Sequence, residues 1–153
     1  MYKKFGQFID GKWSESSDKS TYEVINPANE EIIGSASKAT PQDVDRALKS
    51  AERGLETWKK TSPWQRSYII RKIADRIRDK QDILAKWMTL EVGKPIVEAK
   101  GEVNGAADIF EWNAEETKRI YGQTVESRFE DTRVHVYYQP VGVVAALSPW
   151  NFP

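Results

Sequence analysis

The sequence has 153 residues, and Lys plus Arg and Asp plus Glu both number 23, so the formal net charge is zero. A balanced charge offers no general attraction to nucleic acid or to an anionic membrane, and no apolar stretch approaches the ~20 residues that span a bilayer. The absence of cysteine excludes disulfides, thiolate metal sites and a thiol nucleophile from these residues. Because MYKKFGQFIDGKW lacks the apolar core of a signal peptide, we expect a cytoplasmic protein.

The N-terminal region carries the signals of two short β-hairpins. Large residues alternate around Asp10-Gly11, a dipeptide strongly favoured in two-residue hairpin turns. Asn26-Pro27 is a turn signal between two apolar pairs, at 24–25 and 32–33. The region therefore predicts a small β layer.

Three amphipathic helices are predicted after this layer, because apolar residues recur there at helical spacing. The first begins at the N-cap residue Thr40. The second begins at Ser62, which fits a capping box with Gln65, and its pattern continues to the glycine and proline of EVGKP, residues 91–95. The third is expected over residues 95–121.

Gly101 and Gly105 lie one turn apart inside the third predicted helix. Each glycine costs a helix about 1 kcal/mol relative to alanine, so another interaction should offset the pair. Close packing of a neighbouring backbone is the simpler explanation. Room for a ligand is the alternative, and the pattern leaves both open.

The period changes to two after Gly122, which predicts an antiparallel hairpin with one exposed face. The next run, VGVVAAL at 141–147, is apolar on both faces and is typical of a buried strand in a parallel sheet. A parallel strand needs parallel neighbours, and amphipathic helices need a sheet to cover. We therefore expect an α/β fold of which these residues form one part.

The stretch SPWNFP follows this expected strand, at the strand end where α/β proteins bind ligands. Ser148 and Phe152 each precede a proline and are restricted to extended conformations, so Asn151 lies in a stiffened segment. A fixed amide donor beside a developing alkoxide can contribute ~3 to 4 kcal/mol to catalysis. Asparagine also commonly bonds turn backbone, and spacing alone favours that ordinary role.

SPWNFP resembles the TPWNFP signature of the NAD(P)-dependent aldehyde dehydrogenase superfamily. FIDGKW, VINPA, EVGKP, GEVNGAADIFEW and PVGVVAALSPWNFP also follow the order and spacing of that family along the whole chain. IFEWNAEETKRIYGQTV is most similar to the branch with succinate-semialdehyde and related small-aldehyde dehydrogenases. The resemblance implies the N-terminal part of a Rossmann-like cofactor domain at 1–121, an oligomerisation hairpin at 122–140, and the first parallel strand with its active-site loop at 141–153.

The resemblance also implies roles for individual residues. Asn151 is expected in the oxyanion hole. A segment along the nicotinamide ribose of NAD or NADP is expected to comprise Leu147, Ser148, Pro149, Trp150 and Asn151. A tunnel for a small aldehyde is expected to be bordered by Phe152, Gly101 and Gly105. A monovalent-cation site is expected near the backbone of Val24 and Glu91.

By the same resemblance, the aldehyde would become a carboxylic acid through a cysteine thiohemiacetal, with hydride passing to NAD(P)+. The nucleophilic cysteine and the general-base glutamate belong to later segments of that family, so these 153 residues alone are expected to be inactive. The hairpin implies a homo-oligomer, either a dimer or a tetramer.

Two other functions are compatible with the sequence. The helices and hairpin could form a non-catalytic module that binds another protein. Residues 59–80 contain eight Lys or Arg and two Asp, which could indicate a nucleic-acid patch. A solvated helix face explains this basic stretch without a ligand, and no nucleic-acid partner is expected.

His135 has no second histidine to share a metal and is expected at the surface.

Overall fold

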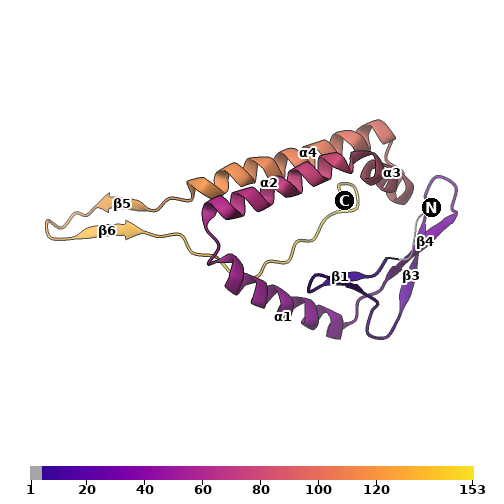
Figure 1. Ribbon diagram of the computed structural model, residues 1–153, viewed down its shortest axis with the longest axis horizontal. Helices are drawn as coiled ribbons and strands as arrows, with labels where there is room; N and C mark the ends of the chain where they lie inside the picture. Colours follow the sequence, from indigo (N-terminus) through magenta and orange to yellow (C-terminus); the bar gives the residue numbers. More distant parts are fainter. Residues whose placement is uncertain (1–4) are drawn as a thin grey trace.

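Figure 1 shows the computed structural model, which describes residues 5–153 as an α/β structure with a helical layer, small antiparallel sheets and a projecting hairpin. The β layer comprises β1 (Gln7–Ile9), β2 (Lys12–Ser14), β3 (Thr21–Ile25) and β4 (Ile32–Ser37). The helices are α1 (Pro41–Trp58), α2 (Pro63–Asp79), α3 (Gln81–Val92) and α4 (Ile96–Glu116), and a 3-10 turn, Thr117–Arg119, follows α4. The projecting hairpin pairs β5 (Gln123–Glu126) with β6 (Arg133–Val136).

Both predicted N-terminal hairpins are confirmed. Asp10 and Gly11, which connect β1 to β2, have φ angles of 55° and 74°, as a two-residue turn with two left-handed positions requires. The β3–β4 pairing brackets the Asn26-Pro27 turn and contains a bulge between Val24 and Ile25. Phe5 then pairs in parallel with Ala36 of β4, so the start of the described chain lies against the second hairpin.

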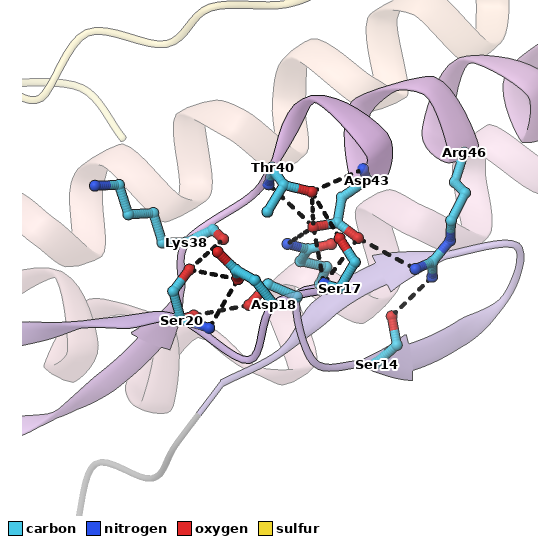
Figure 2. Close-up of polar contacts among 10 residues, drawn as sticks. Ser14, Ser17, Asp18, Ser20, Lys38, Thr40, Asp43 and Arg46 are labelled. Carbon is cyan, nitrogen blue, oxygen red and sulfur yellow. Dashed lines mark hydrogen bonds and ion pairs between the residues drawn. The ribbon is translucent and has the colours of Figure 1, made fainter.

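Asp43 joins the β layer to the start of α1 (Figure 2). Its side chain is 1% exposed, and Oδ2 accepts hydrogen bonds from the backbone N–H of Thr40 at 3.0 Å and of Ser17 at 3.1 Å. Oδ1 pairs with Arg46 at 3.1 Å. Thr40 Oγ1 accepts from the Asp43 N–H in return, which completes a capping box. The predicted cap at Thr40 is confirmed, and Asp43 ties it to the preceding loop.

The expected second helix is two helices in the structure, so residues 5–153 contain four α-helices rather than three. The backbone leaves helical geometry at Lys80, with φ −104° and ψ 10°, and α3 begins at the next residue. The turn lets Ile77 of α2 and Leu84 of α3 pack together against the buried residues Ala99 and Val103 of α4. Ser62 accepts from the Gln65 N–H at 3.2 Å as predicted, but the reciprocal half of that capping box does not form.

Small side chains and ion pairs hold α2 against α4. The fully buried residues in the two helices are alanines: Ala74 in α2, and Ala99, Ala107 and Ala114 in α4. Arg71 pairs with Glu111 at 2.6 Å and with Glu115, and Arg78 pairs with Glu111 at 2.6 Å and with Asp108 at 2.8 Å. The hydrogen bonds from Arg78 and then Arg71 lower the pKa of Glu111 below its usual value. The basic stretch of α2 is therefore only partly the solvated face that we expected.

The predicted strand at 141–147 is not formed in the described part of the chain. This segment returns from the hairpin along the helical layer without strand pairing (Figure 1). Val141 is 93% exposed and Leu147 is 94% exposed. A parallel strand exists only through hydrogen bonds to parallel neighbours, and residues 5–153 supply none. The β5–β6 hairpin is confirmed, but both of its faces are exposed, because no other element among residues 5–153 covers it.

Replacing Asp43 with Asn should lower the free energy of unfolding at pH 7, because the carboxylate serves as both cap acceptor and ion-pair partner. The backbone N–H of Thr40 is the largest cause that lowers the pKa of Asp43, although burial opposes it. A depressed folded-state pKa stabilises the fold above the unfolded value of roughly 3.9, and this stabilisation is lost as the pH falls below it.

Urea unfolding at pH 7 and pH 3 measures this effect. The difference between the wild type and Asp43→Asn should be smaller at pH 3. Asp45→Asn, an exposed position in the same helix, is the control and should change little. An undiminished difference at pH 3 would show that the ionised carboxylate is not what stabilises this junction.

Candidate functional site

The C-terminal segment ends in a turn that leaves the Asn151 side chain free. The Phe152 N–H lies 3.4 Å from the Pro149 carbonyl oxygen, which closes the turn through the backbone. The Asn151 carboxamide makes no hydrogen bond with any residue from 5 to 153, and the residue is exposed. The turn therefore forms without the side-chain bond that asparagine often contributes. Two amide donors remain available to a ligand.

A hollow of about 670 Å³ lies between α4 and this terminal turn. Gly101 and Gly105 line it from the helix, and Asn151 and Phe152 line it from the turn. The structure thus brings together both glycines of the expected tunnel, the expected tunnel-wall aromatic residue and the expected oxyanion donor. A Cβ built on either glycine would meet nothing within 4 Å, so no neighbouring backbone in the described chain packs closely against them. The glycines contribute open space here.

The residues expected to contact the cofactor form one exposed stretch that approaches the hollow. Leu147 is 94% exposed and Trp150 is 83% exposed, and the intervening Ser148 and Pro149 are also exposed. These side chains carry no charge. The stretch can therefore pack against the uncharged part of an organic ligand but offers no cation to a phosphate group.

The expected cation-site residues lie on different elements. Val24 belongs to β3, and Glu91 lies in the last turn of α3. The two elements approach each other at Gly93, where an added Cβ would lie 3.2 Å from Pro27 Cγ. Within residues 5–153, no group of three or more His, Cys, Asp or Glu side chains is arranged to hold a metal ion. A site made of backbone carbonyls remains a prediction.

Two charged residues at the hollow form a contact that the sequence did not predict. Lys94 and Glu102 line it and form an ion pair, with side chains only 14% and 17% exposed. Lys94 Nζ also donates to the backbone carbonyl oxygen of Asn151 at 2.7 Å. Lys94 belongs to EVGKP, which indicated only the end of a helix. The density of glutamates on the third predicted helix indicated that Glu102 is exposed, and this expectation is wrong because its side chain is only 17% exposed. Only the fold brings this pair to the terminal turn.

His135 has a structural role in the hairpin. Its Nδ1 lies 3.2 Å from Thr124 Oγ1, its cross-strand partner, and its ring centroid is 6.2 Å from that of Tyr137. It lies on β6, in the hairpin that projects away from the helical layer (Figure 1).

No helix in the described chain has the length and apolar character that crossing a membrane would require.

The sequence is similar to proteins of known type. Residues 13–153 match the model of the Aldehyde dehydrogenase family. The glutarate-semialdehyde dehydrogenase of Pseudomonas aeruginosa is 43% identical over 146 residues, covering 95% of this chain and 30% of that protein. The NADP(+) succinate-semialdehyde dehydrogenase of Escherichia coli is 43% identical over 145 residues, covering 95% of this chain and 30% of that protein.

Solved structures show the same fold. The crystal structure of an E. coli NADP-dependent enzyme superposes with a TM-score of 0.93 at 42% identity, covering 97% of this chain and 31% of that one. Betaine aldehyde dehydrogenase of Staphylococcus aureus, solved in complex with NAD+, superposes with a TM-score of 0.90 at 35% identity, covering 97% of this chain and 30% of that one. The chain spans about three tenths of the length of these relatives. It belongs to the aldehyde dehydrogenase family.

Proposed function

We propose that this chain is the N-terminal part of an NAD(P)-dependent aldehyde dehydrogenase, which oxidises an aldehyde to a carboxylic acid with Asn151 in the oxyanion hole. The free carboxamide of Asn151 at the hollow beside α4 is the observation that carries the proposal. Among residues 5–153 this amide has no hydrogen-bond partner, and it lies next to open space of a size suited to a small organic molecule. Family membership supplies the reaction type.

Asn151 acts on the oxygen of the aldehyde. When a thiolate attacks the carbonyl carbon, a C–S bond forms and the carbonyl π electrons move to oxygen, which becomes negative. An N–H of Asn151 Nδ2 donates to that oxygen and lowers the barrier without exchanging a proton. These 153 residues contain no cysteine, so the thiol must come from another part of the complete fold.

The dinucleotide, when bound, supplies the hydride acceptor for the oxidation. Relatives and neighbouring structures include enzymes named or solved with NADP and with NAD+. Residues 147–151 suit the nicotinamide half of such a molecule, because they are exposed and uncharged. They carry no cationic side chain to hold a pyrophosphate, so these residues orient the reactive end of the dinucleotide and do not choose between NAD and NADP.

The proposed substrate is a small aldehyde that enters along α4. Gly101 and Gly105 widen the path, and Phe152 forms a wall opposite them. The relatives named for glutarate and succinate semialdehydes make these two compounds the first substrates to test. The monovalent-cation site near Val24 and Glu91 is proposed as a structural feature of the same domain.

The projecting β5–β6 hairpin is proposed to pair subunits in a homo-oligomer. Val125 of β5 and Val134 of β6 are both more than 40% exposed and are directly paired across the strands. This apolar surface would equally serve a non-catalytic module that binds another protein, so turnover decides between the two functions.

Replacing Asn151 with Ala should lower kcat about 10²-fold or more, because the oxyanion loses its amide donors. The test protein is a fusion of residues 1–153 to the remaining part of the E. coli succinate-semialdehyde dehydrogenase, assayed with succinate semialdehyde and NADP+. Affinity for NADP+ should change little. Asn113→Ala, which removes an amide bonded to Ile109 O farther along α4, is the control. Unchanged turnover in Asn151→Ala, with chemistry shown to limit the rate, would refute the role.

Replacing Gly105 with Leu should raise the KM for the aldehyde several-fold in the same fusion, because the side chain would enter the hollow. The helix should tolerate the change, since an added Cβ meets nothing within 4 Å and leucine favours helix more than glycine does. Gly54→Leu is the matched control, because Gly54 is a helical glycine of α1 with the same open surroundings. An unchanged KM would show that the aldehyde does not pass through the hollow.

The 153-residue chain alone should not reduce NAD+ or NADP+ in the presence of either semialdehyde, because it contains no thiol nucleophile. Absorbance at the reduced nicotinamide band measures this directly. Turnover by the isolated chain at a rate near that of the fusion would contradict the thiol mechanism. A stable complex with another protein, together with an inactive fusion that is folded, would favour the interaction module.

A further inference from the structure

A rigid turn between α3 and α4 presents the Lys94 side chain to the C-terminal segment. Gly93 before it has a φ of 73°, in the left-handed region, and its N–H bonds to the Thr89 carbonyl at 3.0 Å. Pro95 after it has a φ fixed near −54° and is the N-cap residue of α4. Two conformationally restricted neighbours therefore leave Lys94 little backbone freedom.

The ammonium group of Lys94 contacts the terminal turn at two points, both just after the Asn151 α-carbon along the chain. It donates to the Asn151 backbone carbonyl at 2.7 Å. It also lies 4.4 Å from the centroid of the Phe152 ring, within the range of a cation–π contact. Fixing the carbonyl of Asn151 and the ring of the next residue restricts rotation of the peptide plane between them. The direction of the Asn151 Cα–Cβ bond is restricted as a result.

Glu102 completes the arrangement from the second turn of α4. Its carboxylate pairs with Lys94 Nζ, and both side chains are more than four-fifths buried. A largely desolvated ammonium needs a counter-charge, and Glu102 supplies one on the helix that also carries Gly101 and Gly105. Lys94 is thus held in place from α4 while two of its contacts hold the turn.

We propose that Lys94 is a positioning residue for the oxyanion donor, and that the Lys94–Glu102 pair fixes the Asn151–Phe152 backbone so that the Asn151 amide points at the reacting carbonyl oxygen. Lys94 acts through Asn151 and makes no bond to the reacting atoms. The inference rests on the proposed function for its catalytic consequence. Its structural half, the fixing of the turn, can be tested independently of any activity.

The first experiment measures backbone motion in the 153-residue chain. In ¹⁵N-labelled protein, the heteronuclear NOE of Trp150, Asn151 and Phe152 reports ps–ns mobility. Lys94→Met keeps the aliphatic stem and removes the charge, and it should lower these NOE values. Lys100→Met should leave them unchanged, because Lys100 lies on α4 but pairs with Asp82 instead. Equal values in the wild type and Lys94→Met would overturn the proposal.

The second experiment is a double-mutant cycle in the fusion enzyme. Lys94→Met should lower kcat about 10-fold or more, because even a small displacement of the Asn151 amide from its working position is costly. The KM for NADP+ should stay within about two-fold, and Lys94→Arg should recover part of the loss. In an Asn151→Ala background, Lys94→Met should have no further effect on kcat, since a residue that acts through Asn151 has nothing left to position.

The outcomes separate the two proposals. If Asn151→Ala lowers kcat as expected but Lys94→Met leaves kcat unchanged, only the positioning role is overturned. Equal losses from Lys94→Met in both backgrounds also overturn it, because Lys94 would then act independently of Asn151. No loss from Asn151→Ala overturns the proposed function, and the NOE comparison still decides whether Lys94 fixes the turn. Where Lys94→Met does not fold, Glu102→Gln replaces it in both experiments with the same expected direction.

Discussion

The close approach of α2 to α4 is the constraint on which the rest of the structure depends. Alanines are the fully buried residues of both helices, so the two backbones can approach closely. Arg71 and Arg78 then bridge to acidic side chains of α4 across the edge of this contact. With α2 and α4 fixed, α3 and the turn at Gly93 have one position available, and the residues of α4 that line the hollow are held on a rigid helix.

Local chemistry made much of this fold predictable. Asp10-Gly11, Asn26-Pro27 and the cap at Thr40 determine their turns through backbone preferences of the residues themselves, and the structure forms all three. The break at Lys80 was not predictable, because the apolar spacing continues across it and only packing against α4 selects the bend. The segment 141–147 has a strand composition but no partner strand within the described chain, so composition alone overstated what these residues can form.

Part of the site was also predictable from the local backbone preferences of individual residues. The stiffened amide of Asn151 and the helical glycines are visible in the sequence, because prolines and glycines restrict or free the backbone locally. Lys94 and Glu102 were not, since their significance lies in contacts with residues far along the chain. A lysine in a helix-ending turn and a glutamate on an acidic helix face are ordinary until the fold places the terminal turn beside them.

The central claim is that the Asn151 carboxamide faces the reacting carbonyl oxygen in the complete fold. A crystal structure of the fusion enzyme with an aldehyde adduct trapped on its active-site thiol measures this directly. The account predicts Asn151 Nδ2 about 3 Å from the adduct oxygen, within hydrogen-bond distance. An adduct oxygen bound by other donors, with the Asn151 side chain directed away from the thiol, would contradict it.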